Sequence, residues 1–179
     1  MAHIKVAEGA PGIMGLLKQY PESAKPLMNL AEHLLKSETE GLNSAERETI
    51  AAYVSNLNEC VFCSESHAGA ADAYWGEAGF SKMAWSGEQS AYSDRLKSYL
   101  KIAEQVQATP TRVNKEDVEH AKSLGATDQD LHDVVLIASA FCMFNRYVDA
   151  LDTFAPPRGD QGYMNMGQML AQGGYLQEF

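Results

Sequence analysis

With 179 residues, of which 45% are hydrophobic and 21% charged, the chain has the size and composition of one globular domain that folds without disulfides. Its net charge of -10 argues against nucleic acid and against an anionic membrane surface as partners. Three cysteines, an odd and low number, do not suit a secreted disulfide scaffold, so we expect a reducing, cytoplasmic location.

Neither a signal peptide nor a membrane span is expected. The first residues lack the basic segment followed by an apolar one that marks a signal peptide. The longest apolar stretch, residues 134–144, is too short to cross a bilayer. Both observations favour a cytoplasmic protein with no membrane partner.

Apolar residues recur at helical spacing along most of the chain, and no segment alternates with the period of two that a half-buried strand requires. Residues 1–22 are expected to be irregular, because Pro11, Gly12 and Pro21 interrupt them. One more short helix is expected after Gly162. The main helices are predicted over residues 24–40, 44–57, 59–75, 88–107, 114–124 and 128–154.

Side chains that accept hydrogen bonds from a helix start mark several of these boundaries. Ser23 and Ser44 are expected to cap the first two helices. Arg47 stands where a capping box needs an acid, so the box of the second helix is predicted to be incomplete. Thr127 or Asp128 is expected to cap the last long helix, whose middle is apolar on every side and predicts a central buried helix.

This pattern predicts an all-α fold, a helical bundle with six to seven main helices. No linker, low-complexity segment or solenoid repeat divides the chain. We therefore predict a single domain over residues 1–179, with a core over about residues 23–155 and a C-terminal tail over residues 156–179.

Two thiols and an imidazole are concentrated in the third predicted helix. Positions 60, 63 and 67 share one face of a helix with 3.6 residues per turn. Cys60 and Cys63 are spaced for a reversible disulfide, and Cys60 lies at the helix start, where the dipole lowers a thiol pKa. His67 titrates near neutral pH and can relay a proton. The constellation predicts a redox-active dithiol with a proton shuttle.

A histidine that relays protons needs a carboxylate to orient it. Glu65 points away from the shared face, and Glu59 is rotated by about 100° from Cys60. Glu48 lies on the preceding helix, twelve residues before Cys60. An antiparallel hairpin of the two helices is expected to bring Glu48 opposite His67.

The spacing Glu48-x11-Cys60-x2-Cys63-x3-His67 resembles the signature of the alkylhydroperoxidase D-like family, in the peroxidase-related branch of the carboxymuconolactone decarboxylase superfamily. Runs outside the motif, such as Pro-Gly-Ile-Met-Gly-Leu-Leu near the start, extend the resemblance over residues 10–155. It implies an all-helical homo-oligomer (dimer, trimer or hexamer) with thiol-dependent peroxidase activity.

The resemblance also implies roles for these residues. Cys63 would attack an organic hydroperoxide and become a sulfenic acid, and Cys60 would donate a proton and then resolve it as a disulfide. His67 and Glu48 would form the proton relay. An unidentified thiol or dithiol would be the reductant, and no cofactor or metal is implied. The best-studied family members carry a second histidine just before the second cysteine, where this chain has Phe62.

Other interpretations of the motif remain open at this point. Zinc would need Glu48 as its fourth ligand, because a second CxxC is absent, and we expect no metal. A redox sensor or oligomeric scaffold would keep the fold without peroxidase turnover. Lactone decarboxylase chemistry, found in the wider superfamily, does not rely on a thiol pair.

Several residues outside the motif are expected to be structural. Cys142 is expected to pack as a small hydrophobe. Arg146 and Asp149 are three apart, as in a helix-surface pair. The remaining candidates are aromatic residues that either pack in the core or wall an apolar pocket, and methionines expected to form a packing surface between subunits. They are Trp75, Phe80 and Trp85, and Met164, Met166 and Met169.

Overall fold

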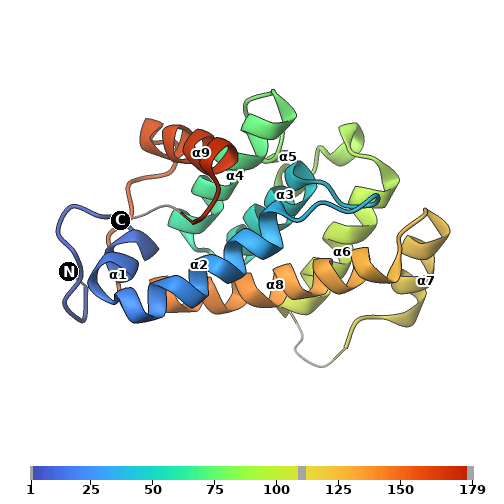
Figure 1. Cartoon of the computed structure of the whole chain (residues 1–179). Coiled ribbons are helices and arrows are strands. Elements are labelled where there is room, and N and C mark those ends of the chain that lie inside the picture. Colours follow the sequence, from blue (N-terminus) through green and yellow to red (C-terminus); the bar gives the residue numbers. More distant parts are fainter. Residues whose placement is uncertain (1, 109–111, 177–179) are drawn as a thin grey trace.

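The computed structural model describes residues 2–108 and 112–176. Within these ranges the chain is all-helical and has no strand, which confirms the predicted all-α class, with more helices than the six to seven expected (Figure 1). The elements are α1 (Ile13–Gln19), α2 (Pro21–Lys36), α3 (Ser44–Leu57), α4 (Val61–Trp75), α5 (Met83–Ser86), the 3-10 helix η1 (Gln89–Ala91), α6 (Asp94–Ala108), α7 (Lys115–Ser123), α8 (Asp128–Asp149) and α9 (Gln161–Gly173).

The prediction that residues 1–22 are irregular is wrong for their second half, which forms α1 and the start of α2. Helix α2 begins at Pro21, because proline has the backbone angle of a first helical residue and lacks only an amide that would be unpaired there. Ser23 is therefore inside the helix and does not cap it.

The N-cap of α3 lies one residue earlier than predicted. Asn43, not Ser44, is the N-cap, and its side chain accepts from the amide of Glu46 at 3.0 Å. The Glu46 carboxylate in turn accepts from the Asn43 amide at 3.0 Å, so the capping box is complete. The prediction of an incomplete box failed because a shift of one residue placed Arg47, rather than Glu46, at the acidic position.

Helices α3 and α4 form the antiparallel hairpin that was predicted, and α9 packs on the other side of α4 (Figure 1). Ala68, Ala70 and Ala71 of α4 are fully buried and allow close approach, as expected from their small side chains, whereas Ala73 is exposed. At Gly69 and Gly167 the backbones of α4 and α9 touch: a Cβ added to Gly167 would lie 2.2 Å from the carbonyl carbon of Gly69. This contact fixes α9 against α4, the helix that carries Cys63.

Helix α8 begins as predicted at a capping box between Thr127 and Asp130, and runs along the length of the molecule against α2, α3 and α6 (Figure 1). It ends at Asp149, five residues before the predicted end at Phe154, and the left-handed backbone of Asp152 lies just beyond it. One face is buried, but Val135 and Met143 on the other face are exposed, so the prediction of burial on every side is wrong.

The segment between α4 and α6 contains α5 and η1, so the predicted helix over residues 88–107 is shorter and begins at Asp94. Trp75, Phe80 and Tyr92 pack together there, with ring centroids 5.0 Å and 5.2 Å apart, and Trp75 also donates to the Thr49 hydroxyl at 3.0 Å. Trp85 also packs against the core, so the predicted core packing of Trp75, Phe80 and Trp85 is confirmed. No helix in the described residues is long and apolar enough to span a membrane.

Candidate active site

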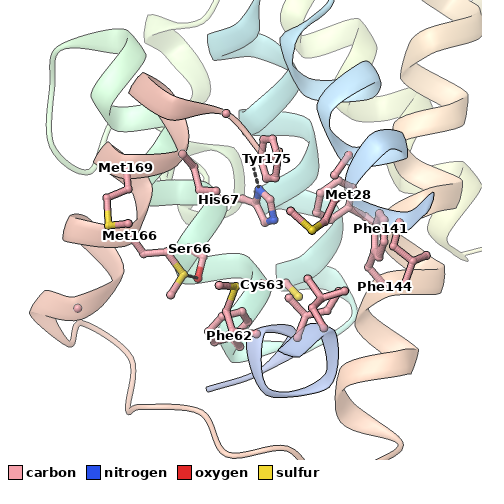
Figure 2. A pocket seen from close by; sticks show the side chains of 18 of the residues that line it. Met28, Phe62, Cys63, Ser66, His67, Phe141, Phe144, Met166, Met169 and Tyr175 are labelled. Atoms are coloured by element: carbon pink, nitrogen blue, oxygen red, sulfur yellow. Dashed lines mark hydrogen bonds between the residues drawn. The ribbon is translucent and has the colours of Figure 1, made fainter. Parts of the chain in front are cut away.

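A cavity of about 290 Å³ lies between five helices, and one face of α4 forms its floor (Figure 2). Its walls are mainly aliphatic, aromatic and thioether side chains from α1, α2, α8 and α9. They include Leu17, Leu27, Met28, Phe141, Phe144, Met166, Met169 and Leu170. From α4 the cavity is contacted by Phe62, Cys63, Ser66 and His67. Cys63 and His67 of the predicted motif therefore face a largely apolar space.

The two motif cysteines differ in their access to this cavity. Cys63 is 4% exposed and lines it, whereas Cys60 is fully buried and does not contact it. Both are free thiols. A hydrogen bond to Cys63 and burial raise the pKa of the Cys60 thiol well above its usual range, with a smaller contribution from the Asp149 carboxylate. The expectation that the helix start favours the Cys60 thiolate is therefore wrong.

Cys60 occupies its place because the connection between α3 and α4 is very short. Glu59 adopts a left-handed backbone (φ 62°), and the Cys60 amide bonds to the Ser55 carbonyl at 3.0 Å. Cys60 is consequently the N-cap of α4 rather than its first helical residue, three positions before Cys63 in the first turn.

Glu48 contacts His67, as the hairpin prediction required. The Glu48 carboxylate is fully buried, and its Oε2 accepts from His67 Nδ1 at 2.8 Å. Because an ionised carboxylate only accepts, the Nδ1 atom of a neutral His67 carries the proton and Nε2 is left as a lone-pair acceptor. In Figure 2 the second ring nitrogen lies on the side of His67 that faces Cys63 and the cavity.

Tyr175, in the segment that follows α9, completes this cluster. Its hydroxyl donates to Glu48 Oε1 at 2.5 Å and lies 3.2 Å from His67 Nδ1. Its ring stacks on the imidazole with centroids 6.0 Å apart, while Phe141 of α8 contacts the imidazole edge to face at 4.6 Å. His67 is thus held on two sides by rings and at one nitrogen by a carboxylate.

Phe62 occupies the position before the second cysteine, and its surroundings are apolar. Its ring packs edge to face on Tyr163 of α9, with centroids 6.1 Å apart. Gly12 leads into α1 with a left-handed backbone (φ 53°), and a Cβ there would lie 2.2 Å from the Phe62 ring. Glycine is therefore required at this close approach. Phe62 closes the cavity on the side of α1 and supplies no proton-transfer group.

No protein-family model matches the chain. It is 27% identical to the uncharacterized protein YdfG of Bacillus subtilis (strain 168) over 129 residues, which are 70% of this chain and 84% of that protein.

Two solved structures are similar over most of the chain. The first is the alkylhydroperoxidase AhpD core of an uncharacterized peroxidase-related protein from Ralstonia eutropha JMP134, with a TM-score of 0.76, 22% identity, and coverage of 88% of this chain and 81% of that one. The second is an uncharacterized peroxidase-related protein from Silicibacter sp. TM1040, with a TM-score of 0.74, 24% identity, and coverage of 86% and 80%. The chain has the alkylhydroperoxidase D-like fold.

Within this alkylhydroperoxidase D-like fold, two residues near the thiols were not found from the sequence. Tyr175 was missed because only a Gly-Gly-Tyr run marks the end of α9, and that run signals a turn rather than a contact. Asp149 was interpreted as a surface partner of Arg146, but Arg146 donates to the Cys142 carbonyl at 2.8 Å. Burial raises the pKa of Asp149, and a hydrogen bond from the Cys60 thiol opposes this.

Other sequence interpretations are resolved by the same geometry. Glu65 points away from the cavity, as predicted, and pairs with Lys82 at 2.7 Å and Arg158 at 3.2 Å. Met166 and Met169 line the cavity, which the sequence did not predict, and the Ser66 hydroxyl donates to the Met166 sulfur at 3.4 Å. In the part of the chain that the structure describes, no three His, Cys, Asp or Glu residues are arranged to hold a metal ion.

Proposed function

We propose that the protein is a thiol-dependent peroxidase that reduces organic hydroperoxides, with Cys63 as the nucleophile and Cys60 as the resolving thiol. The observation that carries this proposal is that Cys63 and His67 open onto one apolar cavity, while Cys60, three residues before Cys63, is fully buried outside it. The names of the two similar structures, which describe peroxidase-related proteins, are consistent with it.

The chemistry follows from the proton positions. His67 Nε2 takes the proton of Cys63, and the thiolate attacks the terminal oxygen of ROOH, so that an S–O bond forms and the O–O bond breaks. The leaving alkoxide takes the proton from His67 and departs as ROH. Glu48 stabilises the transient imidazolium, as a buried carboxylate does for a relay histidine.

The second step uses the buried thiol. Cys60, whose high pKa keeps it protonated in the resting state, attacks the sulfur of the Cys63 sulfenic acid. An S–S bond forms, and hydroxide leaves with the Cys60 proton as water. An external dithiol then restores both thiols by two exchange reactions and becomes a disulfide itself.

The cavity favours a substrate with a hydrocarbon group. Its volume of about 290 Å³ corresponds to roughly ten waters in the liquid, far more than hydrogen peroxide fills. Its walls offer few polar side chains: Cys63, Ser66 and His67 lie on α4, and Asn165 and Tyr175 lie on α9 and just beyond it. An apolar chain would occupy the space between α2 and α9, with the peroxide end directed at α4.

The test is to mix the reduced protein with one equivalent of an organic hydroperoxide and to count thiols by mass spectrometry. We expect loss of two thiols in the wild type, with a Cys60–Cys63 disulfide. Cys63→Ser should abolish the reaction, and Cys60→Ser should stop at a sulfenic acid. Cys142→Ser is the matched control, because Cys142 is a half-buried thiol of α8 outside the cavity.

Steady-state peroxide consumption with a dithiol reductant separates a peroxidase from a redox sensor. A peroxidase turns over many equivalents, whereas a sensor is oxidised once and stops. If Cys60 and Cys63 remain reduced under excess hydroperoxide, or if Cys142→Ser abolishes the reaction, the proposal is wrong.

A further inference from the structure

We infer that Tyr175 is a positioning residue for the relay: its hydroxyl holds the Glu48–His67 pair in the orientation in which His67 Nε2 serves Cys63. This inference rests on the proposed peroxidase function for its kinetic consequence, but not for its structural one. It assigns a role to the segment after α9, which lies outside the motif that suggested the activity.

The contacts of Glu48 show why a second donor is needed there. The carboxylate is fully buried and lies on α3 with no water-exposed face. His67 Nδ1 satisfies Oε2 at 2.8 Å, and the Tyr175 hydroxyl satisfies Oε1 at 2.5 Å. A buried carboxylate oxygen without a donor is costly, and a carboxylate that loses a donor takes up a proton more readily. Tyr175 therefore favours the charged form that His67 requires.

Tyr175 itself is held by its backbone as well as by its ring. Its amide donates to Glu32 Oε2 of α2 at 2.6 Å, and the Gly174 amide ends α9 on the Leu170 carbonyl at 2.9 Å. Gly174 has a left-handed backbone (φ 71°), and a Cβ there would lie 2.5 Å from the Glu32 carboxylate. The chain turns at a position that only glycine fits, and the turn aims Tyr175 inward (Figure 2).

The tyrosine acts as a fixed donor and not as a proton carrier. Burial and the neighbouring Glu48 charge raise the pKa of Tyr175 well above its ordinary value, so the hydroxyl keeps its proton at any pH at which the protein functions. With Oε1 occupied by Tyr175, Glu48 presents Oε2 to Nδ1, and Nε2 is left facing the cavity. The proton-transfer nitrogen is thereby selected by a residue 108 positions away in the chain.

Tyr175→Phe in the full chain tests the inference, because phenylalanine keeps the stacked ring and removes only the hydroxyl. We expect turnover about tenfold lower with an unchanged KM, and an acidic limb of the pH–rate profile moved upward by about one unit, as the loss of one hydrogen bond to a charged group predicts. Nitrogen-15 NMR of the imidazole should show His67 changing from the Nδ1–H tautomer to a mixture.

Tyr74→Phe is the matched control. The Tyr74 hydroxyl also fastens α9, since it donates to the Ala171 carbonyl at 3.0 Å, but it makes no hydrogen bond to Glu48 or His67. We expect Tyr74→Phe to leave the pH profile and the His67 tautomer unchanged. If Tyr175→Phe leaves both unchanged, or if Tyr74→Phe alters both as much, the inference is overturned.

The NMR measurement separates this inference from the proposed function. A wild-type protein that does not reduce hydroperoxides would refute the proposed function alone, and a tautomer change in Tyr175→Phe would still support the positioning role. An active wild type whose His67 spectrum is insensitive to Tyr175→Phe would refute the positioning role alone.

Discussion

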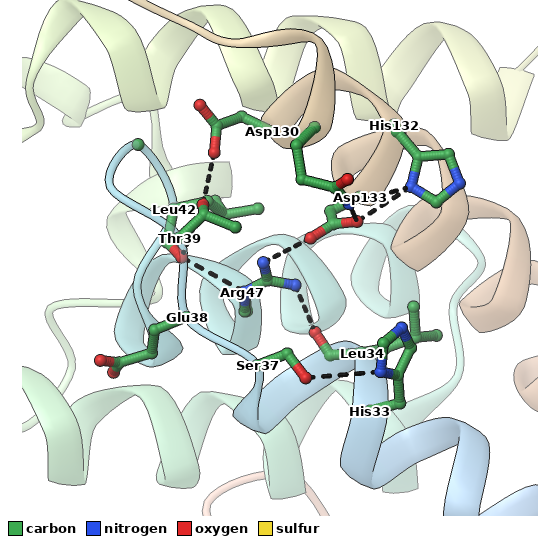
Figure 3. A network of polar contacts seen from close by, with 12 residues as sticks. His33, Leu34, Ser37, Glu38, Thr39, Leu42, Arg47, Asp130, His132 and Asp133 are labelled. Atoms are coloured by element: carbon green, nitrogen blue, oxygen red, sulfur yellow. Dashed lines mark hydrogen bonds and ion pairs between the residues drawn. The ribbon is translucent and has the colours of Figure 1, made fainter.

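Arg47 and Glu48 are neighbours on α3, and both side chains are fully buried, yet they belong to regions with opposite properties. Arg47 donates to the Leu34 carbonyl at 2.8 Å, the Leu42 carbonyl at 3.3 Å and Asp133 Oδ2 at 2.5 Å, within a network that ties α2, α3 and α8 together (Figure 3). Glu48 instead contacts His67 and Tyr175, one residue removed from the cavity.

The comparison shows that burial of a charge does not identify a functional site. The Arg47 network pairs a guanidinium, which is always charged, with carbonyls and a carboxylate, and none of its members lines the cavity. The Glu48 cluster contains an imidazole, a group that can both accept and donate a proton, and this imidazole reaches the cavity. A titratable group with access to a cavity distinguishes the candidate active site from the structural network.

The largest effect is expected from Glu48→Gln, which keeps the shape and the hydrogen bond from Tyr175 but removes the charge. Turnover should fall by a factor on the order of 10² to 10⁴, because His67 loses the charge that stabilises its protonated form. The free energy of unfolding should change little. Steady-state kinetics and urea denaturation of the same sample measure both. A large loss of stability with normal turnover would reverse the assignment of the two regions.

Arg47→Met should have the opposite profile. Removal of the guanidinium leaves the buried Asp133 carboxylate without its cationic partner, with hydrogen bonds only from Gln129 and His132, which costs on the order of 3–5 kcal/mol of unfolding free energy. The rate constant for Cys63 oxidation in the folded fraction should be unchanged. The control is the double variant Arg47→Met/Asp133→Leu, which should recover part of the lost stability because no unpaired charge remains. Equal instability of the single and double variants would contradict this account.

Ala31→Leu tests whether the cavity holds the substrate. Ala31 is a half-buried residue of α2 that lines the cavity, and a larger side chain there fills space proposed for the substrate. We expect kcat/KM for a bulky hydroperoxide to fall about tenfold, with little change for hydrogen peroxide. Ala78→Leu, at an exposed position outside the cavity, is the control. Equal losses for both peroxides would indicate a disturbed site rather than a smaller one.

The smallest effect concerns acid stability. Burial favours the neutral form of Asp133, but hydrogen bonds from Arg47 and His132 outweigh it and lower the pKa of Asp133 below its ordinary value. Because the pKa of Asp133 is lower in the folded state than in the unfolded state, the ionised carboxylate stabilises the fold at pH values above the unfolded-state pKa of about 3.9. This contribution is lost as the pH falls from there through the folded-state pKa. The difference in unfolding free energy between wild type and Asp133→Asn should therefore be constant near pH 7 and should decrease at acidic pH. A gap that widens under acid would contradict the sign.

The predictions that succeeded depend on residues that are near each other in sequence. Apolar periodicity identified the long helices, and the x11 spacing between Glu48 and Cys60 placed the acid opposite His67 because a short turn forces α3 and α4 to be antiparallel. Most errors at helix starts were one to three residues long, as for Ser44 and Asn43, because two adjacent polar residues both qualify as caps. The start of α6 was predicted six residues too early, because α5 and η1 precede it.

The predictions that failed concern features that depend on contacts between segments distant in sequence. Apolar side chains of similar composition form the core at Trp75 and the cavity at Met166, and periodicity does not distinguish the two. The high pKa of Cys60 arises from its burial and its contact with Cys63, which outweigh the local helix start. Neither effect can be predicted until the packing of α8 and α9 on α4 is known.

Local patterns sufficed to predict an all-helical chain and to select four residues for the candidate site, because periodicity and motif spacing are properties of short stretches. The docking of α9 then settled which thiol faces the cavity, what lines it, and how Tyr175 reaches Glu48. The physical reason is that close packing at Gly69 and Gly167 depends on surfaces matching across about a hundred residues, and no local pattern encodes that match.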